Sequence, residues 1–171
     1  MMYPEPTNIW EAIEFSSIGL YIAESTWAFP TLETFHVIGL VTVLGTIMVM
    51  DLRLLGLASS IVPVTRMSKD TLPWTWAGFV VAAITGSLLF VSKASSYVIN
   101  PYFLLKMGFL VLAGLNMLVF HFLTYRTVEH WDEGAHAIPL GAKLAGVFSL
   151  LFWLAVVFFG RAIGFTLGIF F

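Results

Sequence analysis

Ionisable residues at both ends of one long apolar run are the part of this sequence that could do chemistry. In PTLETFHVIGLVTVLGTIMVMDLRLLG, residues 30–56, Glu33 and His36 lie near the start, and Asp51 and Arg53 lie near the finish. An ionisable side chain inside a bilayer costs about 2.5–3.5 kcal/mol at the centre of a helix. A histidine there can ligate haem iron or hydrogen-bond a quinone. The run therefore indicates a functional group at its first end and a membrane boundary at its second.

The composition predicts an integral membrane protein. Of the 171 residues 59% are hydrophobic and only 11% are charged, whereas soluble domains have about 25% charged residues. The mean hydropathy is +0.93. The net charge of −2 gives no reason to expect nucleic acid as a partner. The absence of cysteine excludes disulfides, covalent c-type haem and cysteine-ligated iron–sulfur clusters.

Four apolar stretches are long enough to cross a bilayer, which needs about 20 residues each. A proline lies at the start of each, where its missing N–H is not needed. Asn100 is a candidate N-cap for the third. The sequence predicts spans at about 29–57, 73–95, 101–125 and 139–168.

The segment before these spans predicts a short amphipathic helix at about residues 8–23. Asn8 and Glu11 have the spacing of a capping box. A helix of this length and polarity is typical of the membrane surface rather than of a span. The expected fold is an all-α transmembrane four-helix bundle with an N-terminal interfacial helix, in one domain of residues 1–171.

The basic residues predict the orientation. The N-terminal residues lack the basic start and unbroken apolar core of a signal peptide, and we expect them to be part of the mature protein. Residues 1–31, 94–100 and 162–171 hold no lysine or arginine. The positive-inside rule then places both termini outside a bacterial cytoplasmic (inner) membrane. The side expected to be inner holds Arg53, Arg66, Lys69, Arg126 and Lys143.

Helix counting gathers the ionisable residues into two layers. His36 and Asp51 are 15 residues apart, or about 22 Å along a helix. Lys106 and His121 repeat this spacing in the third span. The predicted outer layer holds Glu33, His36, Lys93, Lys106 and Arg161. The predicted inner layer holds Asp51, Arg53, His121 and Arg126, with His130, Asp132, Glu133 and His136 in the loop that follows.

Each of these residues also has a structural interpretation. Lys93 and Lys106 can extend to the interface, and Asp51 with Arg53 can form an interfacial ion pair. His36 can be a hydrogen-bonding residue between helices. The single E-x-x-H at residues 33–36 is half of a di-iron pattern, which needs two copies. The histidines at 121, 130 and 136 fit no zinc spacing, and a hydrated loop explains the last two.

Several motifs carry a resemblance to a known family. The blocks FPTLETFHVIGLVTVLGTIMVMDLRLLG, YVINPYFLLKMGFLVLAGLN and SLLFWLAVVFFGRAIGF resemble a family of small bacterial four-span membrane proteins catalogued as a domain of unknown function. The resemblance covers most of residues 27–168 and implies the fold. In architecture the chain is also similar to four-helix b-type cytochromes and to the membrane domain of copper-resistance D proteins, an analogy of fold alone.

These observations favour a membrane-embedded electron-transfer subunit that binds b-type haem near the outer face. It would link an extracytoplasmic oxidoreductase to the quinone pool without itself being catalytic. His36 would be an axial ligand, and Lys93, Lys106 and Arg161 would neutralise the propionates. Met107 or a symmetry-related subunit in a homo-oligomer would supply the second ligand, or the iron is five-coordinate.

Two other functions remain open from the sequence. A haem-free quinone-binding or anchoring subunit would use the same residues. A small transporter could use the two charged layers as gates, although the chain shows no inverted repeat and no broken helix. In all three cases the lipid bilayer is the surrounding medium.

Overall fold

The computed structural model describes residues 5–58, 62–128, 132, 138–167 and 169. Every regular element in these residues is helical. They include four helices long and apolar enough to cross a membrane: α3 (Ala28–Leu54), α4 (Val64–Val91), the continuous segment Pro101–Thr127, and α8 (Leu140–Thr166). The chain is a multi-pass membrane protein, and the predicted all-α bundle of four spans is confirmed.

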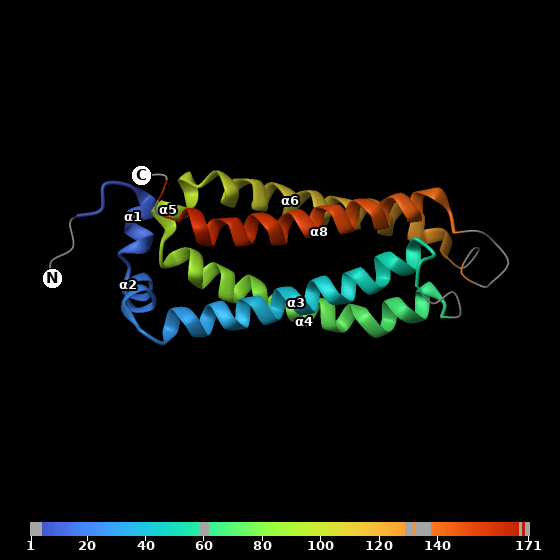
Figure 1. Ribbon diagram of the computed structural model, residues 1–171, viewed down its shortest axis with the longest axis horizontal. Coiled ribbons are helices and arrows are strands. Elements are labelled where there is room, and N and C mark those ends of the chain that lie inside the picture. The colour runs from blue at the N-terminus through green and yellow to red at the C-terminus, as the bar shows by residue number, and fades with distance from the viewer. Residues whose placement is uncertain (1–4, 59–61, 129–131, 133–137, 168, 170–171) are drawn as a thin grey trace.

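The four spans form two helical hairpins that lie along one long axis (Figure 1). The third span consists of α6 (Pro101–Val119), a π-helical turn, η1 (Phe120–Thr124), and a 3-10 turn, η2 (Tyr125–Thr127). α3 packs mainly on α4, and α6 packs mainly on α8. The hairpins join chiefly through α3 and α8, whereas α4 and α6 make little contact.

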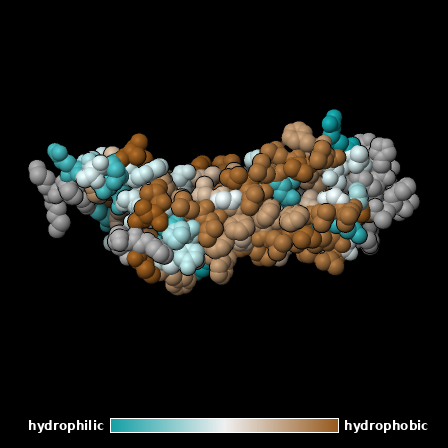
Figure 2. All heavy atoms as spheres, turned by 90° about the horizontal axis from the view of Figure 1, so that it is seen from above, coloured by the Kyte–Doolittle hydropathy of each residue, from teal (hydrophilic) through white to brown (hydrophobic). Residues whose placement is uncertain are grey.

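The middle of the molecule is covered with apolar side chains, and hydrophilic ones gather mainly toward its two ends (Figure 2). Leu115 of α6 and Phe122 of η1 are typical, with exposed fractions of 51% and 60%. Such a continuous apolar surface is unfavourable in water. The long helices therefore contact the hydrocarbon of a lipid bilayer.

Two glycines bring α3 and α4 into close contact. A Cβ atom built on Gly39 would lie 2.8 Å from the carbonyl oxygen of Gly78, and one built on Gly78 would lie 3.0 Å from that of Gly39. Small residues let the backbones of membrane helices approach in this way. The contact fixes which residues of the two helices lie opposite one another.

The segment expected to be one interfacial helix is two short helices. α1 (Ile9–Glu14) and α2 (Ser17–Glu24) are separated at Phe15 and Ser16. The hydroxyl of Ser16 accepts a hydrogen bond from the N–H of Gly19 at 3.2 Å and so caps the second helix. This serine competes with a continuing helix for the backbone donors, which explains the break.

Both predicted N-caps form. The Asn8 side chain accepts from the N–H groups of Trp10 and Glu11. The Asn100 side chain accepts from the N–H groups of Tyr102 and Phe103 at 2.9 and 3.3 Å. These bonds satisfy donors that the first turn of a helix leaves free.

The second span begins at Val64 rather than at Pro73, where the sequence led us to expect it. Pro73 lies inside α4 and is exposed. The added turns are capped by a distant residue, because the carboxylate of Asp132 accepts from the N–H groups of Val64 and Thr65 at 2.5 and 2.8 Å. It also accepts from the Thr65 hydroxyl at 2.6 Å.

Different segments of the chain lie at the two ends of the bundle. At one end, which we call the α5 end, α1, α2 and the short helix α5 (Ala94–Ile99) gather beside the termini of the chain (Figure 1). At the other, which we call the Asp132 end, the Asp132 side chain reaches the start of α4. Asp132 therefore ties the two hairpins together.

The Asp132 carboxylate is held in its charged form. Burial alone would raise the pKa of this carboxyl, but the hydrogen bonds from Thr65 and Val64 and the positive charge of Arg53 together lower it below its usual value. A carboxyl whose pKa is lowered by folding stabilises the protein above its unfolded pKa, about 3.9. That stabilisation is lost as the pH falls through the folded pKa.

Replacing Asp132 should destabilise the bundle in a pH-dependent way. We expect Asp132→Ala to cost about 0.5–2 kcal/mol at neutral pH, as the loss of other N-caps does. The difference from wild type should shrink as the pH falls below about 4. Thermal unfolding in detergent, followed by circular dichroism across this range, measures it, with the exposed Asp70→Ala as control. An effect that does not change with pH would contradict the cap.

Two glycines of α3 should respond differently to the same change. Gly39→Ala forces a methyl group against the backbone of α4, so we expect a loss of about 1–3 kcal/mol, as for other overpacked sites. Gly45→Ala meets nothing within 4 Å and should be neutral or stabilising. Thermal unfolding of both variants measures this difference, and equal melting temperatures would contradict the α3–α4 contact.

Candidate functional site

A cavity of about 630 Å³ lies in the half of the bundle nearest the α5 end, among α3, α4, α5, α6 and α8. Its walls are mostly apolar and aromatic, with a small number of charged groups. A site of this size and composition is typical of a small-molecule or cofactor site. All five residues of the predicted outer layer line it: Glu33, His36, Lys93, Lys106 and Arg161.

His36 is held against α4 through one ring nitrogen. Its Nδ1 lies 2.9 Å from the carbonyl oxygen of Ala82 and 3.2 Å from the Thr85 hydroxyl oxygen. A carbonyl oxygen only accepts, so Nδ1 carries the hydrogen and donates it. The Thr85 hydroxyl donates to a backbone carbonyl of its own helix at 2.6 Å. The other nitrogen of His36, Nε2, is left with its lone pair.

A glycine makes room for this ring. A Cβ atom built on Gly86 would lie 2.8 Å from Cε1 of His36. The imidazole therefore lies directly against the backbone of α4. No sequence pattern pointed to Ala82, Thr85 or Gly86, because their contacts with His36 depend on the register between α3 and α4.

Lys106 reaches the cavity from α6. Its side chain runs past Gly160 of α8, where an added Cβ atom would lie 3.7 Å from Cδ and 3.9 Å from Nζ. Its positive charge acts on His36. Within the described part of the chain, no carboxylate forms an ion pair with this ammonium. Lys106 is thus a partly buried cation facing a cavity.

The other two cations lie beside aromatic rings. The ammonium of Lys93, between α4 and α5, is 5.7 Å from the centre of the Phe29 ring. The guanidinium of Arg161 on α8 is 4.9 Å from the centre of the Phe165 ring. Both distances are within the range of cation–π attraction. These contacts hold two positive charges at the cavity without neutralising them.

A tyrosine that the sequence analysis did not single out also lines the cavity. Tyr97 of α5 packs against Phe90 and Phe103, with ring centres 6.0 and 5.3 Å away. Burial raises the pKa of its phenol, and the negative charge of Glu33 raises it further. The phenol therefore stays protonated and can donate a hydrogen bond. Its place on a short helix between two spans left no pattern to find.

The N-terminal helices close this end of the molecule. The Glu14 carboxylate of α1 accepts from the N–H of Ser95 at 3.0 Å and from the Ser95 hydroxyl. Trp10 packs edge-on against Phe90, with ring centres 6.1 Å apart. α1 is therefore fastened to α5 next to the cavity.

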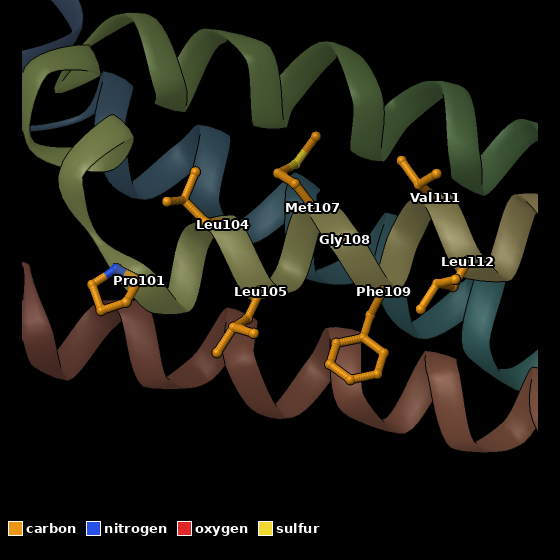
Figure 3. A pocket seen from close by; sticks show the side chains of 8 residues that line it. All are labelled: Pro101, Leu104, Leu105, Met107, Gly108, Phe109, Val111 and Leu112. Atoms are coloured by element: carbon orange, nitrogen blue, oxygen red, sulfur yellow. The ribbon is translucent and has the colours of Figure 1, made fainter.

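Met107, predicted as a second axial ligand, lies elsewhere. It lines a separate apolar groove on α6 and is 41% exposed. Figure 3 shows its side chain on one flank of α6 with Leu104 and Val111, while Leu105 and Phe109 lie on another. Met107 and Lys106 are adjacent in sequence, and neighbours in a helix point about 100° apart. The structure does not bring Met107 to His36.

The residues of the predicted inner layer lie toward the Asp132 end but do not form one cluster. The Nε of Arg53 donates to the carbonyl of Val62 at 2.8 Å, and Asp51 has a hydrogen bond with Ser149. Residues two apart on a helix face different sides, so the expected Asp51–Arg53 pair does not form.

His121 and the following loop complete the inner layer. The His121 ring stacks on Tyr125, with ring centres 5.2 Å apart, and does not line the cavity. His130, Glu133 and His136 lie outside the described residues. Among the described ones, no three His, Asp or Glu side chains are grouped to hold a metal ion.

The comparisons with known proteins point to one family. No curated protein and no solved structure matches the chain. The expected similarity to b-type cytochromes and copper-resistance D proteins therefore stays a prediction. A family model described as "Family of unknown function (DUF6644)" matches residues 10–166. This range includes all four spans and every residue of the predicted outer layer, and the chain belongs to the DUF6644 family.

Proposed function

We propose that the protein is a membrane-embedded electron-transfer subunit that binds a b-type haem in this cavity, with Nε2 of His36 as an axial ligand. The hydrogen bond from Nδ1 to the Ala82 carbonyl carries the proposal. Histidines that ligate metals usually donate their other nitrogen to a carbonyl or carboxylate in this way, which sets the tautomer and the ring orientation. Haem is commonly held by such a histidine.

The positive charges favour an anionic cofactor. An ammonium removed from water is unfavourable unless it is paired. The partly buried Lys106 faces the cavity, and no described carboxylate forms an ion pair with it. Lys93 and Arg161 bring two more cations to the same walls. Two propionates would compensate two charges, and Glu33 would compensate the third. A bare metal ion would add positive charge and is disfavoured here.

The shape of the walls also suits a flat aromatic ligand. Phe29, Phe90, Tyr97 and Phe103 line the cavity with aromatic rings. Gly86 and Gly160 make room for the His36 ring and the Lys106 side chain, the two groups that would contact the ligand. With Met107 outside the cavity, the described lining holds one histidine and no methionine. His36 would hold the haem from this chain, and any further protein ligand would have to come from a second copy or a partner protein.

The hydrogen bond from Nδ1 of His36 to the Ala82 carbonyl also bears on the second candidate function, a haem-free quinone site. With its proton on Nδ1, His36 has only an acceptor to offer the cavity, while a quinone carbonyl needs a donor. A quinol hydroxyl, however, could donate to Nε2. The specific alternative is therefore a quinol-binding or anchoring subunit, and an absorption spectrum distinguishes it from the haem protein.

The proposal also includes an orientation. With the α5 end outside, the haem lies near the outer face, where an extracytoplasmic redox protein could exchange electrons with it. Five described basic residues lie near the Asp132 end and support this orientation by the positive-inside rule: Arg53, Arg66, Lys69, Arg126 and Lys143. The membrane would be the bacterial cytoplasmic membrane.

Purified protein from cells given ample haem precursor should show a Soret band that depends on His36. We expect His36→Ala to abolish or shift it. His121→Ala is the matched control, because it removes the other described histidine of the spans and should leave the band unchanged. A colourless wild-type protein would end the haem proposal and leave the quinol-binding subunit in its place.

Lys106→Met should keep the fold and weaken haem retention. Loss of a charge-assisted bond costs about 1.5 kcal/mol or more, or roughly a tenfold weaker affinity. Transfer of haem to an acceptor such as apomyoglobin measures it. Unchanged retention would show that Lys106 does not contact the propionates.

Cysteine labelling tests the orientation, since the chain has no cysteine of its own. In intact cells, Ser17→Cys on α2 should react with a membrane-impermeant maleimide. Asp70→Cys near the Asp132 end should react only after the cells are opened. Both positions are exposed, and neither change removes a basic residue. The reverse pattern would contradict the proposed topology.

A further inference from the structure

Asp51 is a buried carboxyl group for which the proposed haem site has no use. It lies on α3 near the Asp132 end, with an exposed fraction of 5%. Its Oδ2 atom is buried and has no hydrogen-bond partner among the described residues. An orphaned carboxylate oxygen in a protein interior needs an explanation.

The surroundings of Asp51 are tightly packed and hold few polar groups. α8 approaches so closely that a Cβ atom on Gly146 would lie 3.2 Å from the Asp51 carbonyl oxygen. One turn further along α8, the Ser149 hydroxyl donates to the carboxyl group. Leu54, which lies on α3 like Asp51, packs in an apolar cluster with Val64, Val128 and Ala142.

Among the described residues, no positive charge compensates Asp51. The Nε of Arg53 is engaged with the Val62 carbonyl, and the charge of Arg53 acts on Asp132. The Ser149 hydroxyl, which is neutral, forms a hydrogen bond with the Asp51 carboxyl. The other described charged groups at this end are Arg66, Lys69 and Asp70 on α4, Arg126 on η2, and Lys143 on α8.

We propose that Asp51 is an intramembrane proton-binding site, which holds a proton at neutral pH and exchanges it with the water at the Asp132 end. An ionised carboxylate buried without a cation is strongly unfavourable. Taking up one proton converts it to a neutral acid, with no other reactant. The resulting O–H is a donor, and a backbone carbonyl can accept it.

The ligand is a proton rather than a metal cation. One carboxyl and one hydroxyl supply too few oxygens for a bare ion, since calcium takes about six to eight. A proton needs only the carboxyl. The site stands apart from the haem cavity, whose lining does not include Asp51. The two proposals rest on different residues and can fail separately.

Infrared spectroscopy of the wild-type protein tests the proposal directly. The chain has three aspartates, Asp51, Asp70 and Asp132. Asp70 is exposed, and the pKa of Asp132 is lowered. In protein grown with carbon-13 aspartate, a labelled carboxylic-acid band at pH 7 therefore belongs to Asp51. We expect this band, and we expect it to shift in heavy water.

Two variants test the assignment of this band, and a change of salt tests whether the site binds a cation. Asp51→Asn should remove the band, and Asp70→Asn should leave it. Replacing choline chloride with sodium chloride should not change it. The proposal is overturned by the absence of a labelled acid band at pH 7, by its persistence in Asp51→Asn, or by a titration near the ordinary aspartate value of about 3.9. Loss of the band on adding sodium would assign the site to a cation instead.

Discussion

The close contact of α3 with α4 at Gly39 and Gly78 sets the geometry of the cavity. With the two backbones touching there, His36 lies one turn from the contact on α3, and Ala82 lies one turn from it on α4. A larger residue at either glycine would push the helices apart, and a hydrogen bond of 2.9 Å would not survive such a shift. The tautomer of His36 therefore depends on glycine at positions 39 and 78, and so does the chemistry that this histidine can perform in the cavity.

The distribution of polar groups follows from the cost of placing them in hydrocarbon. Backbone groups in lipid must be satisfied within the helices, and the described spans meet this demand with caps such as Asn100. The charged side chains divide between the two ends. At the α5 end, Lys93, Lys106 and Arg161 face a shared cavity. At the Asp132 end, Arg53 and Asp132 meet at the start of α4, while Asp51 stays apart from both.

Much of this arrangement could be predicted from the sequence, because a helix converts residue number into height. A rise of 1.5 Å per residue was enough to place Glu33, His36 and Lys106 at one level. Proline and asparagine signals located the start of α6 within a residue. The direction in which a side chain points around its helix is a different matter. It depends on which neighbour packs where, and a sequence of nearly uniform apolarity carries little of that information.

The predictions that differ from the structure are mostly those that depend on side-chain direction. Met107 lies at the level of the cavity along α6, but its side chain is on a different face of the helix. Asp51 and Arg53 share a level but not a side. Pro73 resembled a helix start because the residue that caps the true start, Asp132, lies far along the chain. The N-terminal helix broke in two because Ser16 offers a local hydrogen bond that amphipathic spacing does not reveal. Tyr97 and Ala82 contribute only through contacts between separate elements.

The capping of α4 by Asp132 has a consequence for synthesis. α3 and α4 are synthesised before Asp132, so the backbone donors of Val64 and Thr65 leave the ribosome before the carboxylate that caps them. Water at the membrane surface can serve them in the meantime. The carboxylate replaces that water only after the third span has crossed the membrane, and assembly of this end is therefore completed by the second half of the chain.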